Sequence, residues 1–260
     1  MTALTLTLRA APVRDVDLSG LNPERLAVMD RDAIGTMRLA SGQQVQDFFD
    51  IAIGEAEHLV IRNADQQLTH AGAGMRAGTI TIEGDCGAYA GQAMRGGKLI
   101  ITGNAGDFVG GARPGERQGM RGGTIAIYGN AGDRAGERMR RGLILIGGNA
   151  GACCGANMLA GTIFVAGNMG AMPGFALRRG SLLLRRQPQA VPATFQESGE
   201  HSLLFLTLLE KQLQREGAAF ARFLPFPNKA RRYCGDLACG GTGEMLVFQR
   251  DSSNSDIRSS

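Results

Sequence analysis

The sequence has 260 residues and a formal net charge of +4, from 28 Lys and Arg against 24 Asp and Glu. This charge is too small to indicate nucleic-acid binding, and the scarcity of lysine and aromatic residues also argues against it. The 39 glycines are about twice the usual share of roughly 7 % and follow no Gly-X-Y period, so collagen is excluded and many turns are expected.

The start of the chain and its cysteines predict a cytoplasmic protein. The first nine residues alternate Thr and Leu, without the basic start and long apolar run of a secretory signal. The longest apolar segment, from Leu203 to Leu209, is too short to cross a bilayer, so no membrane partner is expected. Five scattered cysteines do not resemble a disulfide framework, and we expect them to be free thiols.

Residues 1–58 are predicted to form an N-terminal cap and irregular first coils. Apolar and polar residues alternate at period two near the start, which indicates an extended edge segment. The segment from Leu21 to Met29 predicts a short helical turn, with Asn22 as its cap and Pro23 at the first helical position. A stack of repeats needs such a cap because its open end would expose apolar side chains and unpaired backbone groups.

Residues 59–186 repeat one short pattern with a period of 19. After a fainter first copy from Val60, the repeated strand begins at Thr79, Lys98, Thr124, Leu143, Thr162 and Ser181. One interval, from Lys98 to Thr124, is 26, and it returns to 19 if the seven residues Ala112 to Gln118 are removed. A fixed period of this kind indicates stacked structural units.

Each copy is built from columns of similar residues. Two branched aliphatic residues, such as Ile80 and Ile82, fall on one face of a strand. Three glycine columns, an Asn or Asp column and a Met column separate three short apolar stretches. The Met column is interpreted as core filler, with metal or redox use as the alternative. The predicted fold is all-β: a right-handed parallel β-helix of about 19-residue coils with three short strands each, an N-terminal cap and a C-terminal helix plus tail.

Residues 187–260 are predicted to form a linker, a helix and a partner-binding tail. The leucines between His201 and Glu216 indicate a helix with one apolar side, capped by Ser198 or Ser202. That side is expected to cover either another protein of an assembly or the flank of the stack. A last strand is expected at Leu246 to Phe248, and the polar end from Asp251 to Ser260 is expected to be disordered.

The chain offers few residues for catalysis. Its three histidines, His58, His70 and His201, do not lie at metal-ligand spacing with one another or with a cysteine. Cys234 and Cys239 are five residues apart, which is not the spacing of a zinc knuckle. We therefore predict no catalytic, cofactor-binding or metal residue on this chain.

An arginine column is the feature that folding alone does not explain. Arginine follows the Met column in five of six copies, and only Leu159 interrupts it. Neighbouring strands lie about 4.8 Å apart, where like unit charges repel by about 1 kcal/mol even at the dielectric constant of water. The column is either simply solvated or binds an acidic partner or an anionic chain. The candidate contacts are Arg76, Arg95, Arg121, Arg140 and Arg178 of the column, with Arg113 and Arg117 of the Ala112 to Gln118 insertion.

The repeat Gly-x-x-x-Gly-x-x-Met-x-x-Gly-x-Ile-x-Ile-x-Gly-Asn-Ala-Gly carries a family resemblance, and Gly136 to Gly151 form the larger part of one copy. It resembles the C-terminal β-helix of the glutamate synthase large subunit. It is still more similar to the C subunit of formylmethanofuran dehydrogenase and of its bacterial relative, the formyltransferase/hydrolase complex. The resemblance extends to Asp47 to Asp50, before the repeats, and to the tail from Gly235 to Glu244.

The resemblance implies a non-catalytic scaffold in one-carbon metabolism and formaldehyde oxidation. Such a complex converts formyl-tetrahydromethanopterin to formate through a formylated methanofuran-type carrier. The implied partners are three further chains of the complex: a zinc metallohydrolase, a molybdoenzyme-like protein without its cofactor, and a formyltransferase. Zinc, carrier and tetrahydromethanopterin are expected on these partners and none on this chain.

Three alternatives remain open from the sequence. The Arg-rich, Lys-poor composition favours the bacterial hydrolase complex over a molybdenum or tungsten formylmethanofuran dehydrogenase with the same kind of C subunit. A free-standing glutamate-synthase-type domain is a second alternative. A carbohydrate- or ice-binding solenoid is the third, although Thr79, Thr124 and Thr162 supply only part of the flat threonine column that it would need.

Overall fold

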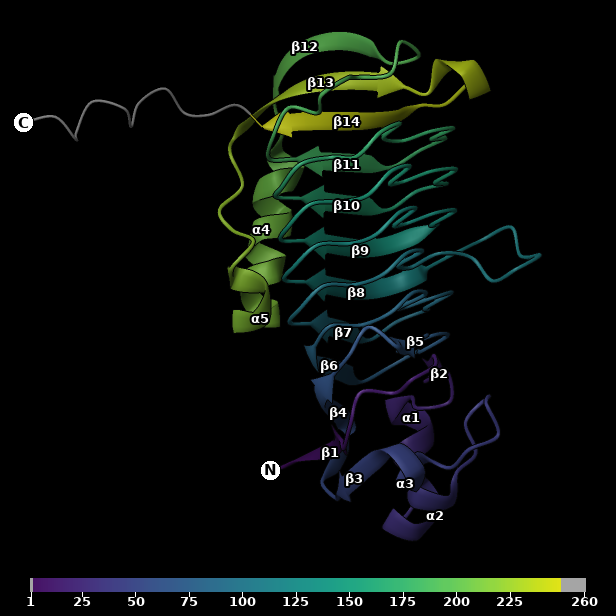
Figure 1. Cartoon of the computed structure of the whole chain (residues 1–260). Helices are drawn as coiled ribbons and strands as arrows, with labels where there is room; N and C mark the ends of the chain where they lie inside the picture. The colour runs from purple at the N-terminus through teal and green to yellow at the C-terminus, as the bar shows by residue number, and fades with distance from the viewer. Residues whose placement is uncertain (1, 249–260) are drawn as a thin grey trace, which may run out of the picture.

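The structure is a computed structural model, and it describes residues 2–248. The described chain is mostly β, with one twelve-stranded, largely parallel sheet, a separate two-stranded sheet and few helices (Figure 1). The strands of the large sheet are β1 (Ala3–Leu8), β3 (Phe49–Ala52), β4 (Glu55–Ala64), β6 (Thr79–Gly84), β7 (Lys98–Ile101), β8 (Arg121–Ile127), β9 (Arg141–Ile146), β10 (Thr162–Val165), β11 (Ser181–Leu184), β12 (Gln196–Ser202), β13 (Lys229–Gly235) and β14 (Gly243–Phe248). The small sheet and the helices are β2 (Val16–Asp17), β5 (Leu68–Thr69), α1 (Pro23–Leu26), α2 (Arg31–Thr36), α3 (Val45–Phe48), α4 (Leu204–Glu216), α5 (Ala218–Ala221) and the 3-10 turn η1 (Leu237–Cys239).

The repeats stack in the register that the sequence predicts. Strands β6 to β11 lie side by side and parallel, and equivalent residues of successive copies pair along the whole row. Lys98 pairs with Thr124 despite their separation of 26 residues, because the chain from Ala112 to Gln118 leaves the stack as a loop (Figure 1). The prediction that this insertion interrupts an otherwise regular period is confirmed.

The inward columns form one continuous core. The two alternating aliphatic residues of every copy, such as Ile125 and Ile127, are fully buried. The methionines of the Met column are buried as well, as is Leu177 in the last copy, so their interpretation as core filler is confirmed. Glycine is required at some corners: Gly136 has φ +72°, and a Cβ atom there would overlap Cδ1 of Ile163 in β10.

The expectation of three short strands per copy is wrong in detail. Each copy has one regular strand, and a second stretch pairs only through single bridges, which link Cys86, Ala105, Ala131, Ala150 and Met169 in turn. The remaining residues form turns. The reason is local: Tyr89 and Phe108 adopt left-handed φ values of 65° and 60°, which interrupt the extended backbone within these stretches.

The Asn and Asp column supports the turn that follows each strand. The backbone N–H of Asn104 donates to Oδ1 of Asp85 at 2.7 Å, and the N–H of Asn130 donates to Oδ1 of Asn104 at 2.9 Å. The Asn130 amide also donates to Oδ1 of Asn104 at 3.1 Å, so side chains of neighbouring copies bond to one another along the column. These side chains satisfy backbone donors at the corner that the sheet does not reach.

Both ends of the stack change to antiparallel pairing. At the N-terminal end β1 is parallel to β4 and antiparallel to β3. The helical turn predicted near Pro23 is confirmed as α1, with Asn22 at the N-cap position and Pro23 as its first residue. The Asn22 side chain forms no capping bond and donates instead to the carbonyl of Ala73. Helices α2 and α3 lie where irregular coils were expected. At the C-terminal end β14 adds a further parallel strand beyond β11, and β13 and β12 follow antiparallel. The strand expected at Leu246 to Phe248 is therefore confirmed and begins earlier, at Gly243.

The C-terminal helix begins later than the sequence predicts. Residues Gln196–Ser202 pair with β13 as strand β12, so α4 starts at Leu204, and Leu203 takes the cap position with no side-chain capping bond. The assignment of Ser198 or Ser202 as the cap is wrong for this reason. The tail from Asp251 to Ser260, expected to be disordered, lies outside the described residues.

A second core joins α4 and α5 to the outer face of the sheet. Its sheet side consists of the middle residues of successive strands, Ile100, Ala126, Leu145, Phe164, Leu183 and Leu246. Leu206 and Leu213 of α4 and Phe220 of α5 pack onto them. The equivalent residue of β6 is Thr81, and the two helices lie beside β7 and the strands beyond it (Figure 1). The strands that the two helices cover are therefore the ones whose middle residue is apolar.

Replacing Ile125 with Ala should lower the free energy of unfolding by roughly 2–5 kcal/mol, because it opens a void in a closely packed stack. The matched control is Ile53→Ala, which removes the same atoms from a side chain that is half exposed. Chemical denaturation of both variants provides the measurement. Equal loss in the two variants would contradict the inward placement of Ile125.

Candidate functional site

The arginine column follows directly from the burial of the methionines. Each Met side chain points inward, so the next residue points outward at the corner before the strand. Backbone bonds hold the column in register: the N–H groups of Arg95, Arg121 and Arg140 donate to the carbonyls of Met75, Met94 and Met120 at 2.7–2.8 Å. Arg76, Arg95, Arg140 and Arg178 are exposed, whereas Arg121 is half-buried.

The inserted loop is fastened to the same face. Glu116 forms an ion pair with Arg121 at 3.1 Å, and its carbonyl accepts a hydrogen bond from Nη1 of Arg138 at 2.9 Å. The Gln92 amide donates to the carbonyl of Ala112 at the other end of the loop, at 3.2 Å. Arg113 and Arg117 lie on the same loop. Two cations of the stack therefore anchor this loop, and two more are carried by it.

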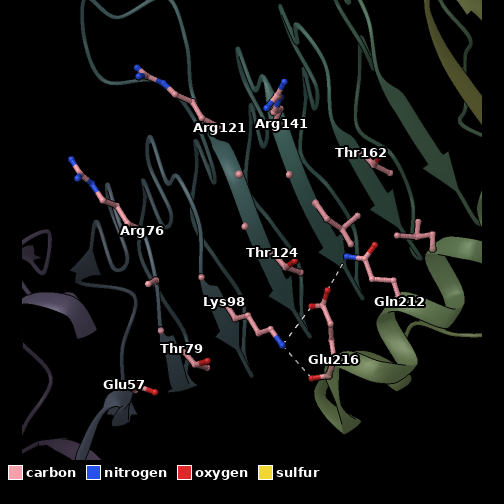
Figure 2. Close-up of a pocket in the computed structure, with 18 residues that line it drawn as sticks. Glu57, Arg76, Thr79, Lys98, Arg121, Thr124, Arg141, Thr162, Gln212 and Glu216 are labelled. Carbon is pink, nitrogen blue, oxygen red and sulfur yellow. Dashed lines mark hydrogen bonds and ion pairs between the residues drawn. The ribbon is translucent and has the colours of Figure 1, made fainter. Parts of the chain in front are cut away.

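A trough of about 990 Å³ runs between the arginine column and α4 (Figure 2). Its floor is the glycine-rich backbone that precedes each strand, and Thr79, Thr124 and Thr162 stand beside this floor. Arg76, Arg121 and Arg141 line the side remote from α4, as Figure 2 shows. The other side is formed by α4 residues of which Leu209, Gln212 and Glu216 reach the trough.

One ion pair closes the α4 side of the trough. Nζ of Lys98 lies 3.7 Å from Oε2 of Glu216 and 3.4 Å from the Glu216 carbonyl at the end of α4 (Figure 2). The same Nζ lies 5.5 Å from the ring centroid of Phe220 in α5, within range of a cation–π interaction. Lys98 thus fastens the helical cover to the stack.

Two smaller hollows continue the arginine face toward the C-terminal end of the stack. One has a volume of about 480 Å³ and is lined by Arg140, Arg141, Arg178 and Arg179 with Leu159 and Ala160. The other, of about 450 Å³, is lined by Arg117, Arg138 and Arg178 with Gln118, Asn157 and Leu159. No carboxylate lines either hollow within residues 2–248.

The structure distributes the predicted contacts unevenly. Arg76 and Arg121 share the trough, and Arg140 and Arg178 share the larger of the two hollows. Arg117 joins Arg178 in the smaller hollow. Arg95 and Arg113 line neither the trough nor the hollows.

Sequence reasoning did not anticipate Arg138, Glu116 or the Lys98–Glu216 pair as parts of this face. For Arg138 the only signal was its place between Gly136 and Met139, at a corner residue that differs from copy to copy. For Lys98 the signal was a charged residue at a strand position that holds Thr in three other copies. The partners Glu116 and Glu216 do not belong to the repeat, so no repeated pattern identifies the pairs.

The cysteine side chains are single thiols. All five cysteines are free, and Cys86 and Cys154 lie within the core. Burial raises the pKa of both thiols to about 12, because the apolar surroundings disfavour the thiolate. Among residues 2–248 no group of three or more His, Cys, Asp and Glu side chains could hold a metal ion.

In the part of the chain that the structure describes, no helix has the length and apolar character needed to span a bilayer.

Comparison with known proteins identifies a structural relative. No protein-family model matches the sequence, and no curated protein matches it. Among solved structures, the chain is similar to a chain of the formyltransferase/hydrolase complex (FhcABCD) from Methylorubrum extorquens, determined in complex with methylofuran. The two are 36% identical, the match covers 95% of this chain and 100% of the other, and the TM-score is 0.80.

The thiols provide a test of the burial pattern. Exposed Cys239 should react with a maleimide in the folded protein, whereas Cys86 and Cys154 should react only after unfolding, even at a pH of about 9. Their folded pKa lies above the unfolded value, so their contribution to stability is present below about pH 9 and is lost as the pH rises toward about 12. Mass spectrometry of the labelled peptides measures which thiols have reacted with the maleimide. Labelling of Cys154 as fast as Cys239 in the folded protein would contradict the packing.

Proposed function

The chain belongs to the same family as the matched chain of the formyltransferase/hydrolase complex, and from this relationship we propose that it serves as the C subunit of such a complex. The observation that supports this most is the extent of the similarity. At 36% identity the match spans the whole of the related chain and 95% of this one, so it is not confined to the repeats.

Within that complex the chain is a scaffold and the chemistry takes place on its partners. The regular placement of its side chains supports this role. The aliphatic and Met columns fill the core, and the Asn and Asp column bonds to the backbone of the next copy. The side chains that neither fill the core nor support the turns face outward, and they are chiefly arginines. A stiff stack of this kind holds other proteins at a fixed separation.

The proposed complex converts formyl-tetrahydromethanopterin to formate by way of a formylated methanofuran-type carrier. The partners are a zinc-dependent hydrolase, a molybdoenzyme-like protein without its cofactor and a formyltransferase. Zinc, the carrier and tetrahydromethanopterin belong to those partners, and the assembly is cytoplasmic. The related complex was determined with methylofuran bound, which supports a carrier of this class.

The stack is, in this proposal, a right-handed parallel β-helix. Its strands β6 to β11 are parallel neighbours joined by crossovers of constant length apart from the insertion. Crossovers between parallel strands are right-handed in about 98% of cases, because of the right-handed twist of the strands. Repetition of one connection gives every coil the same hand.

Two outer surfaces are assigned to partner contact. The first is the arginine column with Arg113 and Arg117 of the loop. The second lies on α4, where Leu204 and Leu208, one turn apart, are 76% and 60% exposed. Leu206 and Leu213 satisfy the contact of α4 with the sheet, so the two outward leucines are not needed for it. An exposed apolar strip on the outward side of a helix whose inward side is packed is typical of a protein interface.

Affinity purification from the native host tests complex membership. The tagged chain should co-purify with a metallohydrolase-like and a formyltransferase-like protein, and the mixture should release formate from formyl-tetrahydromethanopterin. Recovery of the chain alone would contradict the proposal. Ammonia-dependent glutamate synthesis on addition of a flavin and iron–sulfur partner would instead indicate a glutamate-synthase-type role.

The combined substitution Arg76→Gln, Arg95→Gln and Arg140→Gln should leave the melting temperature unchanged, because these side chains are exposed and pair with no carboxylate within residues 2–248. It should weaken assembly or use of the anionic carrier, with the greatest effect at low salt. Arg121 is left in place because it holds the loop through Glu116. Co-purified yield and formate release at two salt concentrations are the measurements. Wild-type values in both would mean that the column is only solvated.

The substitution Leu204→Gln with Leu208→Gln should reduce the recovery of a partner roughly tenfold or more, since buried apolar anchors dominate interfaces. Thr207→Gln is the matched control, because it lies on the same helix and is exposed but polar. Circular dichroism should show the same helix content in both. Equal partner recovery from the two proteins would exclude the α4 strip from the interface.

A further inference from the structure

The two departures from the repeat meet at one place in the structure. The seven-residue insertion contributes Arg117 and ends at Gln118, where the chain re-enters the stack. The only break in the arginine column is Leu159. All three residues line the hollow of about 450 Å³, together with Arg138, Asn157 and Arg178. Irregularities that lie far apart in sequence therefore build one shared feature.

The break in the column creates the space. Arg140, Leu159 and Arg178 occupy the same position in three successive coils. With leucine at the middle position, the two arginines are separated by two strand spacings, about 9.6 Å, instead of one. Leu159 is half-buried and is the apolar residue among those that line the hollow. Arg138 and Asn157 approach from the neighbouring corner, where both adopt left-handed backbone, with φ of 55°.

The polar groups around the hollow lack protein partners of opposite charge. The side chains of Arg117, Gln118, Asn157 and Arg178 form no hydrogen bond or ion pair with any described residue. Arg138 bonds only to the Glu116 carbonyl, and the Glu116 carboxylate is engaged by Arg121. Three guanidinium groups thus surround a space that no carboxylate of residues 2–248 lines.

We propose that this hollow is a binding site for a small ligand with at least two negatively charged oxyanion groups, of the carboxylate or the phosphate class. The guanidinium groups of Arg117, Arg138 and Arg178 bind the oxyanions, since their planar donors match carboxylate and phosphate oxygens. The amides of Asn157 and Gln118 supply further donors, and Leu159 supplies the apolar part of the lining. The proposal narrows the arginine surface assigned above to one site, but it does not depend on the identity of the partner proteins.

Calorimetric titration of the full-length protein, alone or in the complex with which it purifies, tests this site in phosphate-free buffer at low salt. Citrate represents a polycarboxylate and pyrophosphate a phosphate ligand, with acetate at matched ionic strength as the monoanion. We expect one molecule of citrate or pyrophosphate to bind per chain and acetate not to compete. The tighter of the two identifies the preferred oxyanion.

Three variants and a control locate the binding. Arg138→Gln and Arg178→Gln should each weaken it roughly tenfold, the loss of one charge-assisted hydrogen bond. Asn157→Asp should abolish it, because it keeps a side chain that tolerates left-handed backbone and adds a negative charge. Arg95→Gln, an exposed member of the column that lines none of the hollows, should bind as the wild type does.

Two results would overturn the proposal. One is binding of citrate and pyrophosphate no tighter than that of acetate. The other is an equal effect of Arg95→Gln and Arg178→Gln, which would mean diffuse attraction by the whole column. Neither bears on complex membership, because co-purification of the wild-type chain tests that separately. Arg178 forms no side-chain hydrogen bond or ion pair with described residues, so a misfolded Arg178→Gln variant is not expected, and its melting temperature checks this.

Discussion

The backbone register between successive coils is the constraint on which the rest of the molecule depends. Each strand residue pairs with its equivalent in the next copy. Equivalent side chains of successive copies therefore form a column with a spacing of about 4.8 Å. The side chains of an inward column must then be apolar. Those of an outward column must be able to lie next to identical side chains in the neighbouring copies. Gly136 shows how strict this is, since any side chain there would collide with Ile163 of β10. The register is what turns a local sequence motif into a continuous core on one side and a continuous charged face on the other.

The insertion and the two ends show how the stack accommodates exceptions. The loop from Ala112 to Gln118 leaves the pairing of Lys98 with Thr124 intact, because it departs from a corner and not from a strand. At each end the sheet closes with antiparallel strands, β3 on one side and β13 with β12 on the other. The edge strand β3 has only four residues and the edge strand β12 is polar, and both properties limit pairing with other sheets. Departures from the repeat are thus confined to the corners and ends, where partners and ligands have access.

The helical cover divides the outer surface into two different regions. Apolar middle residues such as Phe164 lie beneath α4 and α5, and Lys98 joins the end of α4 to the sheet through Glu216. Across the trough from this cover stand the arginines, of which Arg121 alone among the predicted contacts is paired with a carboxylate within residues 2–248. One face therefore presents the helix α4 with its exposed leucines, and the other presents guanidinium groups and the glycine-rich backbone. A protein with two such unlike faces is suited to contact with two unlike partners.

The sequence by itself determined the period, the inward columns, the place of the insertion and the outward direction of the arginines, because all of these follow from alternation and repetition along one coil. It also carried the resemblance to the formyltransferase/hydrolase complex. It did not determine the number of strands per coil, since left-handed residues such as Tyr89 interrupt stretches that are apolar in composition. It did not show that Ser198 and Ser202 belong to a strand, because that strand exists only through pairing with β13. Only the tertiary structure brought Arg117, Arg138 and Arg178 around Leu159, because their proximity arises from stacking between coils and from a loop that folds back onto it.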